Sequence, residues 1–312
     1  MSTTTTSGDI ASPCQDMAKT LIVVTGPTGV GKTAAAIELA RCLHCDIINA
    51  DSRQIYRGIP ICTAAPTPDE LATVRHHFVA FKNLDENYSA AQFETDVMQL
   101  LPSLWHQGDY AVMCGGSMLY VDAVCRGIDQ LPDISPEVRN AVKAKLQQEG
   151  LESLVKELEQ LDPDYAATID RKNTSRVCHG VEICRQAGVP YSTLRTGTAK
   201  RRDFRIIKLA LNIEREQLFA RINVRVDRMI EMGLEQEARS VYHLRHLNSL
   251  NTVGMKEMFA YFDGTMDRHT AIERMKKNTR VYAKKQLTWY RRDPDITWIT
   301  PDEVLTTALQ RH

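Results

Sequence analysis

A glycine-rich segment between an apolar run and an alanine-rich run places the strongest constraint on how this chain folds. It follows residues 21–24, precedes residues 34–40 and reads Gly26-Pro27-Thr28-Gly29-Val30-Gly31-Lys32-Thr33. The order predicts a β-strand, a tight loop and an α-helix, and the loop matches the phosphate-binding pattern G-x-x-x-x-G-K-[ST]. We therefore expect residues 26–33 to bind a phosphate group. The loop amides and the helix N-terminus would face the anion, Lys32 would reach a phosphate oxygen, and the Thr33 hydroxyl would be offered to Mg²⁺.

Beyond this loop, short apolar runs of strand length alternate with longer helical patterns. Such alternation predicts an α/β fold, here a P-loop NTPase-like parallel sheet. The carboxyl ends of parallel strands meet at one edge of a sheet, so the residues that follow each strand are candidates for a ligand site. The expected strands are residues 21–24, 46–52, 110–114 and 204–211, and the expected helices are residues 34–40, 70–81, 89–104 (capped by Ser89), 215–244 and 270–290.

Residues 122–198 differ from the sequence on either side. They contain helix-like segments and several prolines but no apolar run of strand length. They predict a helical insertion, with the sheet core formed by residues 17–121 and 199–312. Residues 1–16 are rich in Ser and Thr and carry no apolar period, so we expect a disordered extension there.

The charges of the chain balance. With 39 basic and 39 acidic side chains in 312 residues, no long-range field attracts nucleic acid, and any such binding must come from local clusters. One cluster lies between Arg268 and Arg292, where nine Lys or Arg accompany the single acidic residue Glu273 and aromatic residues are interspersed. A helix face of this kind suits phosphate contacts, although charged helix faces are more often solvated surface.

No apolar run approaches the roughly 20 residues needed to span a bilayer, and the N-terminus lacks a signal sequence. We therefore expect a cytoplasmic protein with no membrane partner, and a monomer, since nothing in the sequence demands a dimer. The eight cysteines lack regular spacing and indicate reduced, buried thiols. Cys42-Leu43-His44-Cys45 has a spacing found in zinc sites, with His76-His77 as conceivable partners. Without a second C-x-x-C pair, burial is the better explanation.

Asp51 is the second candidate for chemistry, because it ends the strand that follows the helix of the loop. At that sheet edge its carboxylate would face Lys32 and Thr33. It could hold Mg²⁺-bound water, as an acidic residue does in an ATPase, or remove a proton from an acceptor as a new bond forms. The structural alternative is a helix-capping Asp beside Ser52. The position of Asp51 alone leaves these roles open.

The residues from Asp51 onward resemble the tRNA dimethylallyltransferase family, also called tRNA isopentenyltransferases. The similarity begins at Asp51-Ser52-Arg53-Gln54-Ile55-Tyr56 and follows the order of the family, covering the chain from about residue 19 to residue 292. The other matching stretches are Thr63-Ala64-Ala65-Pro66, His76-His77, Tyr88-Ser89-Ala90-Ala91-Gln92-Phe93, Gly115-Gly116-Ser117-Met118-Leu119-Tyr120 and Lys284-Lys285-Gln286-Leu287-Thr288-Trp289.

The resemblance implies transfer of a dimethylallyl group from its diphosphate to the exocyclic N6 amine of the adenosine next to the anticodon in tRNA. Asp51 would remove the amine proton, while Lys32, the loop amides and Mg²⁺ near Thr33 would stabilise the departing diphosphate. The implied partners are dimethylallyl diphosphate and the tRNA anticodon stem-loop, which the insertion would help to bind. By the same resemblance, the tRNA path is lined by Asp51, Ser52, Arg53, Gln54, Ser117, Arg139, Ser175, Arg176, His179, Asn251, Thr252, Val253, Gly254, Met255 and Lys256.

Several positions depart from the family pattern. Cys62 and Ala65 stand where the family's Gly-Thr-Ala-Lys-Pro turn has Gly and Lys. His179 replaces the second Arg of an Arg-x-x-Arg pair, Met255 replaces Tyr, and Lys285 replaces Arg. Lys and His lack the bidentate phosphate geometry of Arg, so these changes bear on substrate preference and rate more than on the class of reaction.

Three other functions are open at this point. A small-molecule kinase would need an adenine site and a phosphoryl acceptor, which the sequence does not show. An isopentenyltransferase acting on free adenine nucleotides would not need the basic C-terminal region. The third is a non-catalytic tRNA-binding protein, which the substitutions relative to the family pattern would allow. The intact Lys32, Thr33 and Asp51 count against it.

Overall fold

The computed structural model describes residues 19–106 and 108–310. The extension expected at residues 1–16 lies outside these ranges. The chain forms two compact units. Unit 1 contains the described residues up to Asn87, then Gln99–Val121, and those from Asp203 onward, while unit 2 contains Tyr88–Met98 and Asp122–Arg202. The sequence patterns place residues 88–98 in the sheet core, whereas the structure groups them with the helical insertion.

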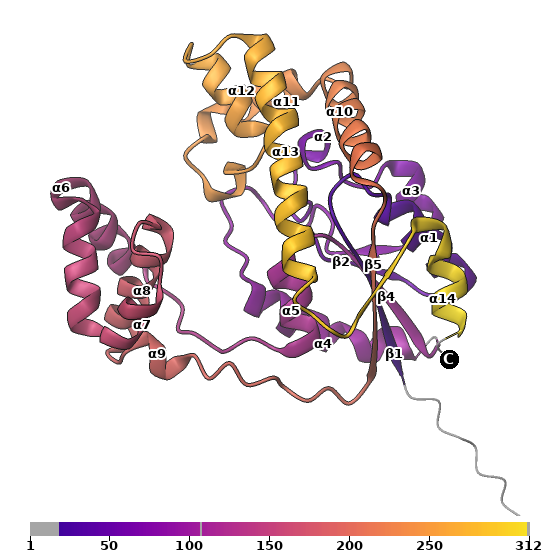
Figure 1. Cartoon of the computed structure of the whole chain (residues 1–312), viewed down its shortest axis with the longest axis horizontal. Helices are drawn as coiled ribbons and strands as arrows, with labels where there is room; N and C mark the ends of the chain where they lie inside the picture. Colours follow the sequence, from indigo (N-terminus) through magenta and orange to yellow (C-terminus); the bar gives the residue numbers. More distant parts are fainter. Residues whose placement is uncertain (1–18, 107, 311–312) are drawn as a thin grey trace, which may run out of the picture. The chain divides into compact units, whose positions relative to one another are not determined.

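A six-stranded sheet forms the centre of unit 1 (Figure 1). Its strand order is β3-β2-β4-β1-β5-β6, and every neighbouring pair is parallel. Residues 21–24 of β1 are all fully buried, as expected for a central strand covered on both faces. The predicted α/β fold is confirmed. The strands are β1 (Thr20–Thr25), β2 (Ile47–Asn49), β3 (His76–His77), β4 (Tyr110–Cys114), β5 (Arg205–Leu211) and β6 (Ile296–Ile299).

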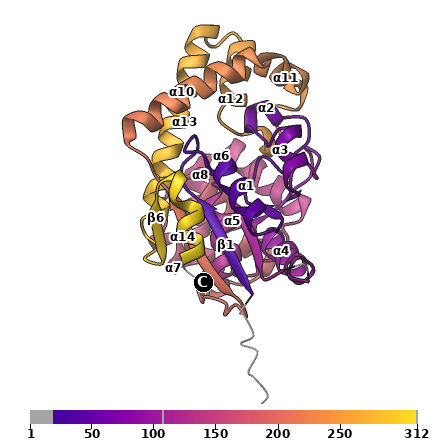
Figure 2. The ribbon, with the colours of Figure 1, turned by 90° about the vertical axis from the view of Figure 1, so that its right-hand side faces the viewer.

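Helices of unit 1 flank this sheet and gather at one end of it. Figure 2 shows α2, α10, α11 and α12 together at that end. α4 (Ala90–Trp105) and α5 (Met118–Arg126) each contain a boundary between the units. The other helices are α1 (Lys32–Cys42), α2 (Pro60–Thr63), α3 (Pro68–Thr73), α10 (Arg215–Glu231), α11 (Leu234–Ser240), α12 (Met255–Phe262), α13 (Arg268–Tyr290) and α14 (Val304–Gln310), with short 3₁₀ turns η1 (Tyr242–Leu244), η2 (Asn248–Leu250) and η3 (Pro301–Glu303).

Unit 2 is helical and has a hydrophobic core of its own. It contains α6 (Pro136–Leu161), α7 (Pro163–Thr168), α8 (Thr174–Ala187) and α9 (Tyr191–Leu194), and its described residues form no strand. Leu154 and Leu158 of α6 and Val177 and Val181 of α8 are fully buried in this core. The helical character predicted for residues 122–198 is therefore what the structure shows.

The helix predicted at residues 70–81 is wrong beyond Thr73. α3 ends there, and His76 and His77 pair with Ile47 and Ile48 of β2 as a short edge strand. Phe78 follows with φ of 63°, in the left-handed region. Pairing with β2, which is distant in sequence, decides this conformation, and the local apolar spacing carries no sign of it.

Two further expectations need correction. The long helix expected at residues 215–244 is divided at Gly233, whose φ is 100°. The seven cysteines in the described ranges are free, and most are buried, but Cys42 is exposed, so burial does not explain that thiol. No helix of the described chain combines the length and the apolar character that crossing a membrane requires.

Glu94 is the buried charge that joins three segments of unit 2. Its side chain is 6% exposed and lies 2.9 Å from Lys200 Nζ and 2.7 Å from Arg202 Nη2. It also accepts the N–H of Ile128 at 3.1 Å. Burial raises the pKa of this carboxyl, but the hydrogen bonds from Arg202, Lys200 and Ile128 outweigh burial and lower it overall.

We expect Glu94→Ala to destabilise the protein by about 3–5 kcal/mol, because it leaves the buried Arg202 guanidinium uncompensated. Urea unfolding measures this change. Glu152→Ala is the matched control in the same unit, since Glu152 is 84% exposed and its pair with Lys156 should contribute at most about 1 kcal/mol. Equal effects of the two substitutions would contradict the role of Glu94 as the buried charge that joins three segments of unit 2.

Candidate functional site

The ends of three adjacent strands bring the candidate residues together. β2, β4 and β1 are neighbours in the sheet, and their carboxyl ends lead into Asp51, Gly115 and the glycine-rich loop. Ala50 N–H donates to Cys114 O at 2.8 Å, and Gly115 N–H donates to Val24 O at 3.2 Å. A Cβ at Gly115 would lie 2.1 Å from Ala50 O, so only glycine allows these strand ends to approach so closely.

The loop has the shape that its sequence predicts. Gly26 has φ of 133°, and a Cβ there would lie 2.6 Å from Leu211 O at the end of β5. α1 begins at Lys32, within the last two residues of the loop, so its first-turn N–H groups face the place where the loop would hold an anion. Lys32 Nζ lies over the loop and donates to Gly26 O at 3.1 Å and to Pro27 O at 2.8 Å. Burial lowers the pKa of Lys32 to about 8.

Gln286 belongs to one of the stretches that resemble the family, although the sequence pattern alone does not place it in the site. Its side chain is 2% exposed and bridges two of the strand ends. Oε1 accepts the N–H of Thr28 at 2.8 Å, and Nε2 donates to Gly116 O at 2.9 Å. The Thr28 amide is therefore engaged by the protein itself and is not a free donor for an anion.

Three arginines of α10 are also brought to the loop. Arg221 Nη1 donates to Val30 O at 3.2 Å, and Arg225 Nη1 donates to Thr28 Oγ1 at 3.3 Å. Arg221, Arg225 and Arg228 all line a cavity beside the loop. Their spacing of four and three residues puts them on one helix face, which is the signal that could have identified them from the sequence. Burial lowers the pKa of Arg225, while Asp51 opposes this shift.

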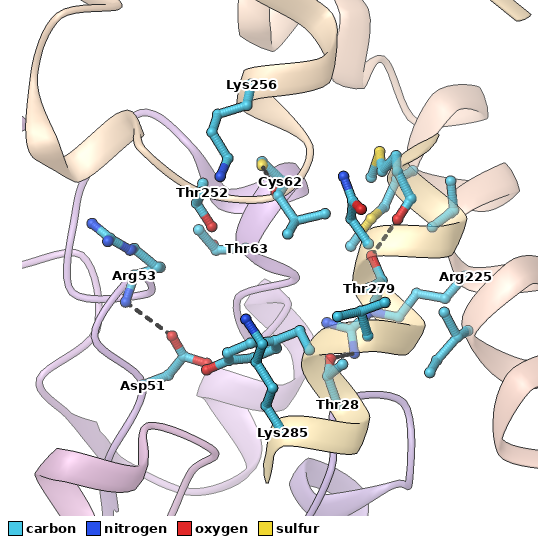
Figure 3. Close-up of a pocket in the computed structure, with 18 of the residues that line it drawn as sticks. Thr28, Asp51, Arg53, Cys62, Thr63, Arg225, Thr252, Lys256, Thr279 and Lys285 are labelled. Atoms are coloured by element: carbon cyan, nitrogen blue, oxygen red, sulfur yellow. Dashed lines mark hydrogen bonds between the residues drawn. The ribbon is translucent and has the colours of Figure 1, made fainter. Parts of the chain in front are cut away.

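Two cavities meet at these residues. The loop cavity, of about 740 Å³, is lined by Gly29, Lys32 and Thr33 together with the arginines of α10. The helix cavity, of about 510 Å³, is lined by residues of α2, α10, α13 and the segment 251–256 (Figure 3). The residues that line both cavities are Thr28, Asp51, Arg225 and Tyr282.

The two oxygens of Asp51 are in different situations. Oδ1 accepts the N–H of Arg53 at 2.9 Å and that of Gln54 at 3.4 Å, so Asp51 caps a turn, and no helix follows it as the capping alternative required. Oδ2 has no hydrogen-bond partner among the described residues. Figure 3 shows the carboxylate between Arg53 and Lys285 at the edge of the helix cavity. One oxygen thus fixes the side chain and leaves the other available for chemistry.

Arg53 and Gln54 use their side chains within the protein. Arg53 Nη1 donates to Asn248 O at 2.8 Å and to Ser249 O at 3.1 Å. Gln54 Nε2 donates to the carbonyl groups of residues 63 and 64 at 3.1 and 3.0 Å. Both residues were expected along the tRNA path, and here they also fasten the turn after Asp51 to the walls of the cavities.

The segment 251–256 is only partly open to the helix cavity. Asn251, Thr252, Val253 and Lys256 line it, while Gly254 and Met255 are buried. Cys62 lies beneath this segment and donates from Sγ to Val253 O at 3.4 Å. Burial raises the pKa of Cys62 to about 12, so it stays a neutral thiol in the cavity wall.

Four further residues of the expected tRNA path lie in unit 2, whereas Ser117 lies in unit 1 at the end of β4. Arg139 is on α6, and Ser175, Arg176 and His179 are on α8. Arg139, Ser175 and Arg176 are exposed, whereas His179 is half-buried beside Tyr191 with ring centroids 5.7 Å apart. Burial lowers the pKa of His179, and the Arg139 charge adds to the effect. At neutral pH His179 therefore carries no cation in place of the expected Arg.

The basic helix α13 is partly neutralised. Lys276 pairs with Asp227 at 2.8 Å and with Glu273 at 3.0 Å, and Arg268 pairs with Glu235. These contacts reduce the charge that the sequence count attributes to the helix. Lys285, by contrast, lines the helix cavity near Asp51.

The oxygen groups that line the loop cavity fit a magnesium ion that takes most of its ligands from the phosphate oxygens of a bound substrate. The described residues contain no group of three or more His, Cys, Asp or Glu side chains that could hold a metal. The Thr33 hydroxyl and the Asp51 carboxylate line the same loop cavity. Mg²⁺ commonly keeps several waters and binds through one or two protein groups plus phosphate oxygens.

Comparisons with known proteins agree with one another. A family model described as IPP transferase matches residues 54–293. The tRNA dimethylallyltransferase 2 of Parabacteroides distasonis is 50% identical over 292 residues, which cover 94% of this chain and 97% of that protein. The tRNA dimethylallyltransferase 2 of Porphyromonas gingivalis is 52% identical over 290 residues, with 93% and 97% covered. The chain belongs to the IPP transferase family.

Solved structures place the IPP transferase fold along most of the chain. The full-length tRNA isopentenylpyrophosphate transferase of Bacillus halodurans is 33% identical, with a TM-score of 0.66 over 94% of this chain and 100% of that one. A eukaryotic dimethylallyltransferase acting on tRNA is 27% identical, with a TM-score of 0.76 over 94% of this chain and 77% of that one. The family resemblance drawn from the sequence motifs is confirmed.

In this IPP transferase, we expect Gln286→Ala to cost about 1–3 kcal/mol for each backbone group left unsatisfied, at Thr28 and at Gly116. Gly116→Ala should also destabilise, because its Cβ would lie 2.4 Å from Gln286 Nε2. In the Gln286→Ala background that clash is absent, so the added cost of Gly116→Ala should shrink. Urea unfolding of the wild type, the two single variants and the double variant measures these free energies. Strictly additive costs would contradict the bridge that Gln286 makes between Thr28 and Gly116.

Proposed function

We propose that the protein transfers a dimethylallyl group from dimethylallyl diphosphate to N6 of the adenosine next to the anticodon in tRNA. The observation that carries this proposal is the meeting of the two cavities at Asp51, with Oδ2 unpartnered. A donor held in the loop cavity and an acceptor held in the helix cavity would react across that junction. The names of the relatives support tRNA as the acceptor and a dimethylallyl group as the group transferred, and the two cavities support separate sites for donor and acceptor.

The chemistry balances with the groups at the junction. The bond between the allylic carbon and the diphosphate oxygen breaks, a bond forms from that carbon to N6, and one N6 proton passes to Asp51 Oδ2. The exocyclic amine is a weak nucleophile because its lone pair is delocalised into the adenine ring. Removal of its proton as the bond forms therefore helps the reaction.

The loop cavity suits the leaving diphosphate. The first-turn amides of α1, the Lys32 ammonium and the Arg225 guanidinium would stabilise the charge that develops on it. The Lys32 ammonium donates to two loop carbonyls and would exchange them for diphosphate oxygens. A Mg²⁺ ion held by Thr33 and the diphosphate would neutralise further charge, which is the chemistry that the metal supplies.

The helix cavity suits a single nucleotide taken out of a loop. Its volume of about 510 Å³ lies in the range of small-molecule sites. Bases in single-stranded RNA loops are unstacked at lower cost than bases in a duplex, and they are read by hydrogen bonds to their edges. Ser52, Asn251 and Thr252 offer hydrogen-bonding groups in the cavity wall, and Lys256 and Lys285 add positive charge for phosphates.

The proposal is tested by incubating the protein with labelled dimethylallyl diphosphate, Mg²⁺ and unmodified tRNA with adenosine next to the anticodon. Label should enter tRNA, and one diphosphate should be released for each group transferred. Label found in AMP instead would identify an enzyme of free nucleotides. ATP hydrolysis or phosphoryl transfer without prenylation would identify a kinase-like use of the loop, and binding of tRNA without transfer would identify a binding protein.

We expect Asp51→Asn to reduce the rate of transfer by about 10²–10⁴-fold, because the amide cannot take the N6 proton. The affinity for dimethylallyl diphosphate should remain close to that of the wild type, since the loop contacts are unchanged. Single-turnover transfer and calorimetric binding separate the two effects. A turnover near that of the wild type would remove Asp51 from the role of base.

We expect binding of dimethylallyl diphosphate to weaken as pH rises above about 8, where the Lys32 ammonium loses its proton in the free protein. The terminal phosphate, with a pKa of about 6, is already ionised there, so the ligand does not add to the effect. The bound anion favours the charged lysine and raises its pKa. Binding between pH 8 and 9 should therefore take up protons.

Titration calorimetry in buffers of different ionisation enthalpy measures this proton uptake. Lys32→Arg is the matched control, because arginine remains protonated throughout this range. Its binding should show neither proton uptake nor the loss of affinity above pH 8. Proton uptake that persists in Lys32→Arg would assign the effect to another group.

A further inference from the structure

Ser117 binds the residues on both sides of Asp51. Its N–H donates to Ala50 O at 3.2 Å. Its Oγ accepts the N–H of Ser52 at 2.7 Å and donates to Ser52 Oγ at 3.0 Å. The peptide that precedes Asp51 and the residue that follows it are thus both tied to one residue at the end of β4.

These contacts leave Ser117 little capacity for an external partner. The residue is 8% exposed. Its one hydroxyl proton and one acceptor lone pair are already used on Ser52. The family resemblance placed Ser117 along the tRNA path, but the hydrogen bonds direct its hydroxyl toward the turn that carries Asp51.

The orientation of Asp51 depends on that turn. Oδ1 accepts the N–H groups of Arg53 and Gln54, so the direction of Oδ2 follows from the backbone at residues 50–54. Arg53 and Gln54 fasten the far side of the turn through their side chains, and Ser117 fastens the near side. Without the Ser117 hydroxyl, Ser52 N–H would lose its hydrogen-bond partner within the protein.

We propose that Ser117 is a positioning residue whose hydroxyl holds Ser52 so that Asp51 Oδ2 faces the junction of the two cavities. This inference rests on the proposed function, because it requires Asp51 to act as the base. A misplacement of about 1 Å in a reacting group can cost about 10²-fold in rate. The hydrogen bonds from Ser117 to Ser52 would therefore matter for turnover rather than for substrate binding.

The test compares Ser117→Thr with Ser117→Val, two side chains of the same shape that differ in the hydroxyl. Ser117→Thr should keep most of the wild-type kcat, and Ser117→Val should lose about 10–10²-fold. The KM for tRNA and the affinity for dimethylallyl diphosphate should be similar in the two variants. A raised KM for tRNA with unchanged kcat in Ser117→Val would overturn the proposal in favour of direct tRNA contact.

A second comparison asks whether Ser117 acts through Asp51. In an Asp51→Asn background the ratio of kcat between the Thr and Val variants should fall to about one, because the base has been removed. A ratio that persists in that background would overturn the proposal. Urea unfolding of the Thr and Val variants shows whether a loss of folded protein contributes.

A spectroscopic readout keeps the test independent of turnover. The NMR chemical shifts of the Ser52 amide and of the Asp51 carboxyl carbon, measured at one pH, should be preserved in Ser117→Thr and altered in Ser117→Val. Identical spectra of the two variants at both positions would overturn the proposal that Ser117 positions Asp51. A wild-type protein that transfers nothing to tRNA would contradict the proposed function, while these spectra still decide whether Ser117 sets the environment of Asp51.

Discussion

Close contact between the carboxyl ends of three parallel strands is the constraint on which the site depends. The ladder continues past the strands through the bond from Ala50 N–H to Cys114 O and the bond from Gly115 N–H to Val24 O. Gly115 makes this possible because any side chain would collide with Ala50 O. The loop after β1, the turn after β2 and the segment after β4 are thereby fixed against one another, and the groups proposed to stabilise the leaving group and to remove the proton are brought together.

Several polar side chains near Asp51 form hydrogen bonds with other groups of the protein. Gln286 joins the loop to Gly116, Arg53 holds the carbonyl groups before Asn251, and Gln54 holds the end of α2. Gln286 is buried and Arg53 and Gln54 are partly buried, and satisfied polar groups with little access to water rigidify a site. The result is that one oxygen of Asp51 is committed to backbone amides while the other faces the cavity. Precise placement of the base proposed at Asp51 requires this kind of support from its neighbours.

The sequence predicts well what depends on local pattern. The loop, the strand at residues 110–114 and the helix capped by Ser89 are found as expected, because periodicity and capping act over a few residues. The edge strand at His76 could not be predicted in this way, since it forms only by pairing with β2. Gln286 and Arg225 reach the site from helices more than 190 residues after the loop, and only tertiary packing brings them there.

The central claim is that the diphosphate end of the donor lies on the loop with its first carbon directed toward Asp51. The most direct measurement is a crystal structure with Mg²⁺ and an unreactive thiolodiphosphate analogue of the donor. The account predicts diphosphate oxygens within hydrogen-bond distance of Lys32 Nζ and Arg225, with the first carbon facing the junction at Asp51. A diphosphate bound in the helix cavity, or a first carbon pointing away from Asp51, would contradict it.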